Sequence, residues 1–423
     1  MSLSVYGEIG IDLLLGDNSR IISRNGGAGL YAAIAAARQE MKIDFLTVYG
    51  PEIDKYSLQF WETMGVSIEN SIYLENYSVP RYIVTGYKAF EHKISTPITD
   101  IKMGIQYVPS LSKDCEGLLL FPVDHSFPES LFEQAIEKNI PIFLDPKPNN
   151  KSINRTREIL KYVTVLLVNE EEALLLSETN EIEEAIKKLE KMGPKYIIVK
   201  KGFKGCNLLY DGHRLELPAY KSKAVCTLGS GDVFGGTLAV TFLRSRDIEY
   251  SVRIANCVAA NFIESMTVET VIDKSGVEKD LYQREMFVLD ENLPKKVYLA
   301  GPFFNKQEIY WVIHISERLK NAQFTVLSPL HENGVINADT SFEQRKKVFQ
   351  ADIDLINDAD VVVALIDQDD TGTCFEMGYA FKKGVPVYGL KTSEKKLNNM
   401  IQFGCNQLFE NIEELIEVLY GKK

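Results

Sequence analysis

Apolar runs of strand length alternate with helical patterns throughout this chain, and this alternation limits its possible folds more than any other feature. The runs include residues 117–121 (GLLLF), 196–200 (YIIVK) and 361–367 (VVVALID). Helical patterns such as residues 128–138 and 181–191 separate them. Strands that alternate with helices predict layers built around parallel sheets, so we expect an α/β fold.

One polar stretch interrupts this alternation and divides the chain. The sequence VLDENLPKK after Phe287 contains Pro, lacks periodicity and is followed directly by a new strand pattern, VYLAG. We therefore predict a first domain at residues 1–287, a linker at 288–295 and a second domain at 296–423. Within the first domain, residues 71–95 alternate in the manner of an antiparallel flap rather than a layer of the main sheet.

Composition narrows the class of ligand. The 423 residues carry a formal net charge of −12, so a nucleic acid polymer would be repelled and small molecules are the expected partners. The six Cys are scattered without a CxxC pair and only five His are present, which argues against a disulfide framework or a zinc site. No apolar run approaches the ~20 residues that span a bilayer, and the first residues lack a basic leader. We expect a cytoplasmic protein without a membrane partner.

The segment CTLGSGDVFGG is the most informative part of the first domain. Gly229, Ser230 and Gly231 bring backbone N–H groups together just before an apolar helical run, an arrangement that gathers an anion. Asp232 in the same turn is suited to act as general base toward a hydroxyl that attacks a phosphoryl group. A Gly-rich loop with a capping Asp explains the same residues, and this segment alone does not decide between the two interpretations.

Further motifs follow other strand patterns of the first domain. Asp12 ends the first of them, in GEIGID, where open α/β sheets bind ligands. The others are RNGGAG before an Ala-rich helix, DPKPN, NEEE and VKKGFKG. In this order, the set resembles the ribokinase-like (PfkB-type) family of sugar and nucleoside kinases, over nearly all of residues 1–285.

The resemblance implies a three-layer α/β/α domain with a small β lid, formed by residues 71–95, that uses ATP and Mg²⁺. The implied roles are an anion hole at Gly229, Ser230 and Gly231, a base at Asp232, nucleotide and Mg²⁺ binding by Gly202, Asn169 and Glu172 (the last through water), and acceptor binding by Asp12, Gly27 and Tyr31. Two positions depart from the family pattern. Cys226 stands where an acidic residue is usual, and Tyr31 lies near the position of a usual Asn, where it either stacks on a base or fills space.

In the second domain, the sequence DDTGTCFEMGYA follows a buried strand pattern. We expect Glu376 in the first turn of a helix, where the helix dipole favours the ionised carboxylate. Gly372 allows a ligand to approach, and Asp370 lies six residues before Glu376. Two neighbouring carboxyl groups suit glycosyl chemistry, in which one attacks C1′ and the other manages the proton of the leaving base. A helix with an acidic N-terminus is the structural alternative.

Together with YLAGPFF at the start of the domain, this motif resembles the nucleoside 2-deoxyribosyltransferase family. The resemblance implies a flavodoxin-like or Rossmann-like parallel sheet, with Glu376 as nucleophile and no cofactor. Asp370 and Asp352 would position and protonate the base, while Tyr298 would orient Glu376 or the sugar. Asn399 falls where the family supplies a residue to a neighbouring subunit, which implies a homo-oligomer.

The sequence therefore predicts a bifunctional enzyme of nucleoside or sugar metabolism. One domain would transfer or hydrolyse at an N-glycosidic bond, and the other would phosphorylate a sugar or nucleoside hydroxyl with ATP. Transferase and hydrolase remain open. So do a degenerate kinase domain that only binds nucleotide and a nucleotide-sensing scaffold, which the departures at Tyr31 and Cys226 would fit.

Overall fold

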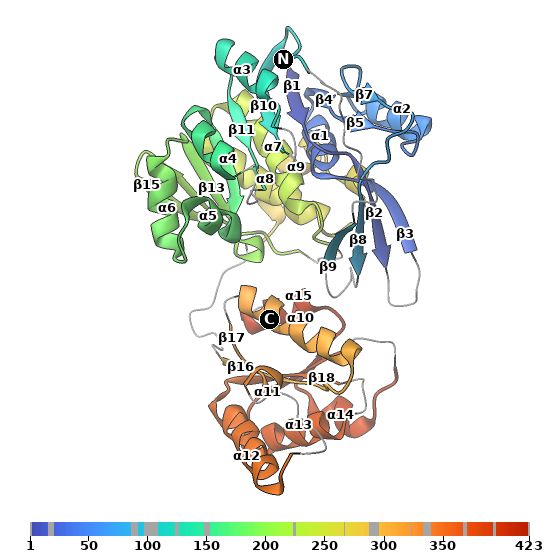
Figure 1. Cartoon of the computed structure of the whole chain (residues 1–423), viewed down its shortest axis with the longest axis vertical. Helices are drawn as coiled ribbons and strands as arrows, with labels where there is room; N and C mark the ends of the chain where they lie inside the picture. Colours follow the sequence, from blue (N-terminus) through green and yellow to red (C-terminus); the bar gives the residue numbers. More distant parts are fainter. Residues whose placement is uncertain are drawn as a thin grey trace. The chain divides into compact units, whose positions relative to one another are not determined.

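A computed structural model describes residues 2–15, 21–85, 92–96, 109–122, 127–147, 153–222, 226–265, 267–286, 296–322, 324–332, 340–366, 370–391 and 395–421 (Figure 1). Two compact units divide the chain between Val288 and Leu289. The predicted linker at 288–295 lies outside the described residues, so its bounds remain a prediction. Each unit is treated below by itself.

The main sheet of the first unit has, in the described residues, nine strands in the order β15-β14-β13-β12-β11-β10-β1-β4-β6. Their bounds are β1 Ser2–Tyr6, β4 Lys42–Leu46, β6 Val66–Ser67, β10 Cys115–Leu120, β11 Ile142–Leu144, β12 Val165–Asn169, β13 Tyr196–Lys200, β14 Cys206–Tyr210 and β15 His213–Leu217. Strands β6 to β13 pair in parallel, while β14 and β15 add an antiparallel edge. The predicted parallel α/β sheet is confirmed.

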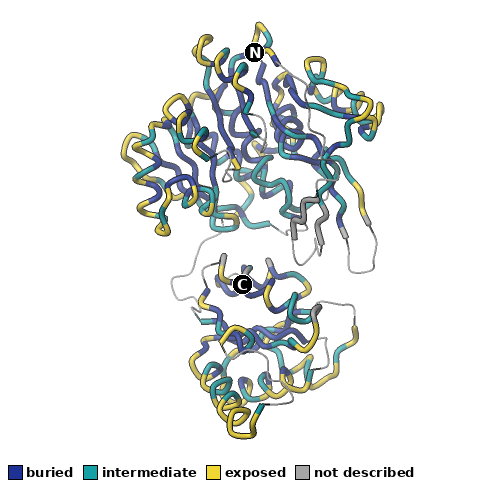
Figure 2. The backbone as a smooth tube through the Cα atoms, viewed as in Figure 1, coloured by how far each residue is buried: buried dark blue, intermediate teal, exposed yellow. Residues whose placement is uncertain are grey.

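Helices cover both faces of this sheet because successive strand residues point to opposite sides. On β10, Leu119 joins the core under α1, α7 and α8, whereas Leu118 and Leu120 join the core under α3 to α6. Figure 2 shows the buried strands between these layers. The helices are α1 Ala28–Arg38, α2 Lys55–Thr63, α3 Glu129–Glu137, α4 Ile153–Ile159, α5 Glu170–Ser177, α6 Ile182–Lys191, α7 Ser230–Ser245, α8 Ile248–Phe262 and α9 Lys274–Gln283.

Helices α1 and α7 approach each other until their backbones touch. A Cβ atom added at Gly236 of α7 would lie 2.1 Å from the carbonyl oxygen of Ala32 in α1. No side chain fits in that space, so glycine is required there.

A small second sheet has the order β3-β2-β8-β9, with β2 Gly10–Leu15, β3 Ile21–Gly26, β8 Arg81–Thr85 and β9 His92–Thr96. The expected flap at 71–95 is only partly correct, because the hairpin of β2 and β3 supplies half of this sheet and β7 (Ile72–Tyr73) pairs instead with β5 (Val48–Tyr49). The placement of Asp12 at the end of the first strand is wrong. Strand β1 ends at Tyr6, and Asp12 lies inside β2, opposite Arg24 of β3.

The second unit has, in its described residues, a five-stranded parallel sheet in the order β17-β16-β18-β19-β20. The strands are β16 Lys296–Ala300, β17 Thr325–Leu327, β18 Val361–Leu365, β19 Val387–Leu390 and β20 Gln407–Phe409. The helices are α10 Lys306–Asn321, α11 Pro329–Glu332, α12 Phe342–Asp358, α13 Thr371–Lys383, α14 Asn399–Gly404 and α15 Ile412–Leu419. Across the described part of the chain, no helix combines the length and the apolar character needed to cross a membrane.

Candidate active sites

The glycine turn of the first unit leads into the long helix α7. Gly229 has φ of 87° and precedes the first helical residue, Ser230. A Cβ atom at Gly229 would lie 2.7 Å from the ring of Tyr31, so glycine is required both for the backbone and for this contact. The N–H groups of Ser230 and Asp232 donate to Thr227 and Gly229 at 3.1 Å, which forms the turn itself. Asp232 therefore lies in the first helical turn rather than in the preceding loop.

Two lysines flank this helix N-terminus. Nζ of Lys147 lies 3.2 Å from Oδ1 of Asp232. Nζ of Lys200 lies 2.5 Å from Oδ2 of Asp145, and a Cβ atom at Gly231 would lie 3.5 Å from the same Nζ. Burial alone would lower the pKa of Lys200, but the nearby carboxylates outweigh it and raise the pKa. Both ammonium groups add positive charge beside a helix end that already favours anions.

Two carboxylates, Glu172 and Asp145, lie near these lysines and interact with each other. Asn169 and Glu172 cap α5 reciprocally: Oδ1 of Asn169 accepts from the Glu172 N–H at 2.7 Å, and Oε2 of Glu172 accepts from the Asn169 N–H at 2.8 Å. Burial and the charge of Asp145 raise the pKa of Glu172. Asp145 is 1% exposed, and its Oδ1 has no hydrogen-bond partner within the described residues.

These groups fit a hydrated divalent cation. Mg²⁺ keeps several waters and takes one or two protein carboxylates together with substrate phosphates. The orphaned Asp145 oxygen beside Glu172 offers such a donor set. Within the described residues no cluster of three or more acidic, His or Cys side chains could enclose a metal, so a closed protein cage is not formed there.

A pocket opens between the glycine turn and the small sheet, lined among others by Glu8, Asp12, Tyr31, Tyr82 and Asp232. The hydroxyl of Tyr31 donates to Asp12, and the hydroxyl of Tyr82 donates to Glu8. Burial and the Asp12 charge raise the pKa of Tyr31, so its proton stays in place. The pocket thus combines the helix N-terminus with hydroxyl and carboxylate groups suited to a polyhydroxylated ligand.

Asp12 is held from two sides. Besides Tyr31, Nε of Arg24 lies 3.4 Å from Oδ2 of Asp12, and the Arg24 guanidinium lies 5.5 Å from the centre of the Tyr31 ring. Arg24 also donates to Sγ of Cys226 at 3.8 Å. Gly27, with φ of 96°, ends the turn before α1, where a Cβ atom would lie 2.6 Å from the carbonyl of Glu8.

In the second unit, Tyr298 of β16 meets Glu376 of α13. The Tyr298 hydroxyl donates to Oε1 of Glu376 at 2.9 Å. Burial, together with the charges of Asp352 and Asp370, raises the pKa of Glu376 to about 8, although the Tyr298 hydrogen bond opposes this shift. The expected first-turn position is wrong: α13 begins at Thr371, which places Glu376 in the second turn, where the helix dipole contributes little.

The other predicted residues of this unit lie on α12, α13 and α14. Asp370 caps α13, since its Oδ2 accepts from the N–H and the hydroxyl of Thr373 at 2.6 and 2.7 Å. Asp352 on α12 is half-buried, and its charge acts on Glu376. Gly372 is exposed in the first turn of α13, and Asn399 is exposed at the start of α14.

Comparison with known proteins matches both units to enzyme families. Residues 111–274 match the model of the pfkB family carbohydrate kinases, and residues 297–413 match that of the nucleoside 2-deoxyribosyltransferases. The chain is 27% identical to a cytidine kinase of Thermococcus kodakarensis over 271 residues, which cover 60% of this chain and 93% of that protein. It is 31% identical over 101 residues to a protein of Thermofilum pendens named as a candidate 2′-deoxynucleoside 5′-phosphate N-hydrolase, covering 24% of this chain and 70% of that protein.

The chain joins a PfkB-family kinase domain to a nucleoside 2-deoxyribosyltransferase-family domain. Among solved structures, the aminoimidazole riboside kinase of Salmonella enterica, complexed with aminoimidazole riboside and an ATP analogue, matches with a TM-score of 0.57 and 19% identity. That match covers 66% of this chain and all of the other, and it confirms the ribokinase-like fold of the kinase domain.

The structure brings most of the predicted residues together within each domain. In the kinase domain, Asp12, Gly27, Tyr31 and Asp232 line one pocket, while Gly202 lies in the turn after β13 with φ of 58°. In the transferase domain, Tyr298 and Glu376 form a direct contact.

Sequence reasoning did not assign roles to three residues that line the kinase pocket, Glu8, Tyr82 and Lys147, or to three charged residues near it, Arg24, Asp145 and Lys200. The DPK motif directly after a buried strand was the available signal for Asp145 and Lys147. Arg24 opens the RNGGAG motif, but its pairing with Asp12 depends on the small sheet, and Tyr82 carries no sequence signal.

Proposed function

We propose that the kinase domain transfers the γ-phosphoryl group of ATP to a hydroxyl of a nucleoside or sugar. Asp232 takes the proton of the acceptor hydroxyl, whose oxygen forms a bond to the γ-phosphorus as the bond to ADP breaks. Bound Mg²⁺ would neutralise phosphate charge, and Asp145, Asn169 and Glu172 are the residues that would hold it. The placement of Asp232 in the first turn of α7, where it lines the pocket, carries this proposal.

The transferase domain would act on an N-glycosidic bond through Glu376. Its carboxylate forms a bond to C1′ while the bond from C1′ to the base breaks. The base leaves with the bonding electrons and gains a proton from solvent, relayed by Asp352 or Asp370. A second base or water then releases the glycosyl group from Glu376. The hydrogen bond between Tyr298 and Glu376 supports this role, because it fixes the attacking oxygen.

The two reactions fit together in one order. A nucleoside kinase produces a nucleoside phosphate, and the relative from Thermofilum pendens is named for hydrolysis of a 2′-deoxynucleoside 5′-phosphate. We infer that the kinase product is a compound on which the transferase domain can act.

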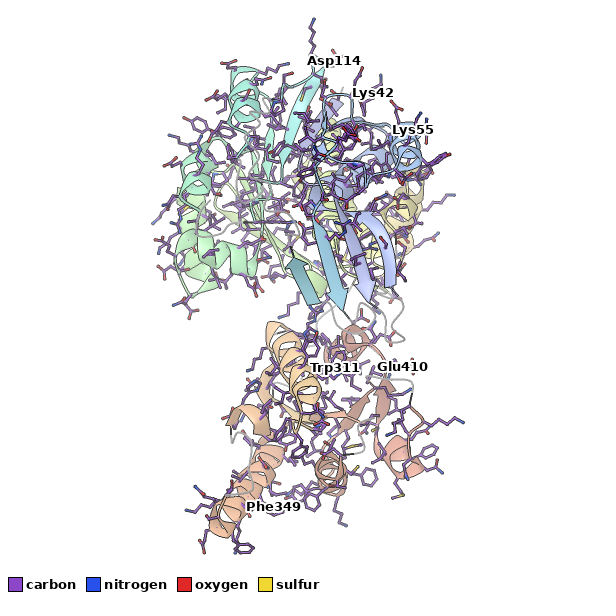
Figure 3. The ribbon with its side chains drawn as sticks, turned by 45° about the vertical axis from the view of Figure 1, so that its right-hand side comes forward. Lys42, Lys55, Asp114, Trp311, Phe349 and Glu410 are labelled. Atoms are coloured by element: carbon purple, nitrogen blue, oxygen red, sulfur yellow. The ribbon has the colours of Figure 1, made fainter. Side chains whose placement is uncertain are left out.

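The transferase domain also carries an apolar face that supports a homo-oligomer. Helices α12 to α14 expose large side chains: Phe342, Phe349, Phe375, Met400 and Phe403, each at least half exposed. The rings of Phe349 and Phe375 lie 5.8 Å apart, and Figure 3 shows Phe349 extending outward from α12. We propose that a second copy of the chain covers this face and that Asn399, exposed beside Met400, completes its neighbour's site.

A nucleotide-binding module without kinase activity is the second candidate for the first domain. Tyr31 donates a hydrogen bond to the Asp12 carboxylate, and Arg24 forms an ion pair with it. These contacts support the second candidate, because they leave a substrate hydroxyl less access to that carboxylate.

One experiment tests both domains. Wild type, Glu376→Ala and Asp232→Asn are incubated with deoxycytidine and adenine, with and without ATP–Mg²⁺, and the products are separated by chromatography. Deoxyadenosine, free cytosine or a nucleoside phosphate identifies transfer, hydrolysis or phosphorylation. Glu376→Ala should lose only the glycosyl products. Asp232→Asn should lose the phosphate, together with any glycosyl product that forms only in the presence of ATP–Mg²⁺. If wild type binds ATP but phosphorylates no nucleoside or sugar, the nucleotide-binding module is correct.

A further inference from the structure

Lys147 combines an unusual backbone with a contact to the expected base. It is the third residue after β11 and has φ of 38°, in the left-handed region that side-chain-bearing residues rarely adopt. Its ammonium group lies 3.2 Å from Asp232, it lines the pocket, and it lies 5.9 Å from the centre of the Phe121 ring.

A purely stabilising role explains this poorly. The Lys147 side chain is 40% exposed, and ion pairs that are this accessible to water contribute little to stability. A strained backbone conformation has a cost that such a pair does not clearly recover. Such a conformation persists where surrounding contacts hold it, and at Lys147 those contacts bring the ammonium group to Asp232 and the pocket.

The neighbouring lysine provides a contrast. Lys200 is 19% exposed and pairs with the buried Asp145, so its ammonium group is held beside the N-terminus of α7. Lys147 instead reaches Asp232 from the acceptor pocket and remains accessible from it. The two lysines therefore differ in their surroundings, since Lys200 is held by a buried carboxylate while Lys147 reaches both Asp232 and the pocket.

We propose that Lys147 positions the transferring phosphoryl group, with its ammonium group between that group and Asp232. The inference rests on the proposed kinase function. As the acceptor proton moves to Asp232 and the bond between γ-phosphorus and ADP breaks, negative charge spreads over the phosphoryl oxygens. Lys147 keeps all its protons and neutralises this charge, so it favours the transition state over bound ATP.

Lys147→Met removes the charge at nearly constant length, Lys147→Arg keeps it, and Lys187→Met on the exposed face of α6 is the matched control. With cytidine as acceptor, Lys147→Met should lower kcat about 100-fold with little change in KM for ATP, as loss of one transition-state contact does. Lys147→Arg should recover part of kcat, and Lys187→Met should match wild type.

Calorimetry supplies a readout other than turnover. Affinity for ADP–Mg²⁺ alone should be unchanged in Lys147→Met, whereas affinity for ADP–Mg²⁺ with aluminium fluoride and cytidine, which mimics the transferring phosphoryl group, should fall at least about tenfold. Unchanged kcat, or an equal loss of affinity for both complexes, would overturn the proposal. Thermal unfolding checks that the variants fold. If Lys147→Met does not fold, a Lys147→Arg variant that keeps part of kcat and of the analogue affinity supports the charge role, and one as inactive as Asp232→Asn overturns it. A wild type that forms neither product nor the analogue complex refutes the kinase function itself.

Discussion

In the proposed reaction Glu376 loses its proton before it attacks C1′, yet the fold makes that loss difficult. Burial and two nearby carboxylates raise its pKa to about 8, and only the Tyr298 hydroxyl acts in the opposite direction. A carboxyl group with a raised pKa is protonated at lower pH, so the reactive form is a minority at neutral pH. A small change in pH or in the charge around Glu376 therefore changes the fraction of Glu376 that is ionised and reactive.

The pH dependence of the glycosyl reaction should report this balance. We expect kcat/KM to rise with pH and to level off above about pH 8, because kcat/KM follows the free enzyme. Tyr298→Phe should move the rise to higher pH, since it removes the group that stabilises the anion, and Asp352→Asn should move it to lower pH. Product formation measured from pH 5 to 10 checks both shifts. A flat profile, or a shift of Tyr298→Phe to lower pH, would contradict this account of the Glu376 proton.

At the level of single residues, the sequence identified the nucleophile candidate but not its electrostatics. The motif places Glu376 near a helix start, and the expected dipole effect requires the first turn. Where α13 begins depends on the cap that Asp370 forms with Thr373, and the net pKa depends on Asp352 from another helix. The cap is a local signal that lies within the motif itself, whereas the charge of Asp352 comes from a separate helix and is not visible in the local sequence.

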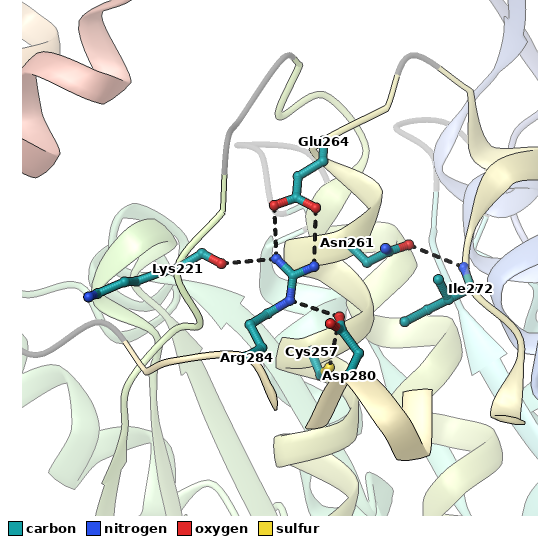
Figure 4. A network of polar contacts seen from close by, with 7 residues as sticks. All are labelled: Lys221, Cys257, Asn261, Glu264, Ile272, Asp280 and Arg284. Carbon is teal, nitrogen blue, oxygen red and sulfur yellow. Dashed lines mark hydrogen bonds and ion pairs between the residues drawn. The ribbon is translucent and has the colours of Figure 1, made fainter. Parts of the chain in front are cut away.

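Among the elements, α9 is attached both by apolar packing of Val277 and by a polar network around one arginine (Figure 4). Arg284, directly after α9, donates two bonds to Glu264 at 2.9 and 3.1 Å, one to Asp280 at 2.8 Å and one to the Lys221 carbonyl at 2.9 Å. Its side chain is 12% exposed. The network joins α9 to the end of α8 and to the segment after β15.

Replacement of Arg284 should therefore weaken the kinase domain. We expect Arg284→Met to lower the free energy of unfolding by about 2 kcal/mol, since it removes charge-assisted bonds and leaves Glu264 and Asp280 without their cation. In a Trp311→Phe background, the buried Trp61 becomes the single tryptophan and reports urea unfolding of this domain alone. The free energy of unfolding of Arg284→Lys should lie between those of the parent and of Arg284→Met, because lysine keeps the charge but not the planar guanidinium. A midpoint equal to that of the parent would show that the network contributes no stability.

The main strands and helices were predictable, and the small sheet was not. Runs such as 117–121 and 196–200 are apolar because both faces of a parallel sheet are buried, and this pattern is local. Strand β2 buries a carboxylate, Asp12, which is tolerable only because Tyr31 and Arg24 reach it. The sequence pattern of β2 does not contain those partners, so neither its strand nor the surroundings of Asp12 could be predicted.

For the whole molecule, we expect the transferase domain to work without the kinase domain. Residues 295–423 contain Tyr298, Glu376, Asn399 and a separate core, so the fragment should fold, form oligomers and act on nucleosides. Inactive Glu376→Ala and Asn399→Ala subunits, mixed under conditions where subunits exchange, should regain part of the activity. Phe349→Asp should reduce the oligomer in sedimentation experiments. Exchange without any recovery would mean that each site belongs to one chain.

The close approach of α1 and α7 at Gly236 has a consequence for how this kinase domain can evolve. Tyr31 stands on α1 and Asp232 on α7, so the spacing between the acceptor wall and the base is set where two backbones touch. Side chains elsewhere in the core can be exchanged without altering that spacing, while any larger residue at Gly236 would push the helices apart. For the proposed kinase reaction, acceptor preference can therefore change through substitutions in the pocket lining and the small sheet. The spacing between the acceptor wall at Tyr31 and the proposed base at Asp232 stays constant.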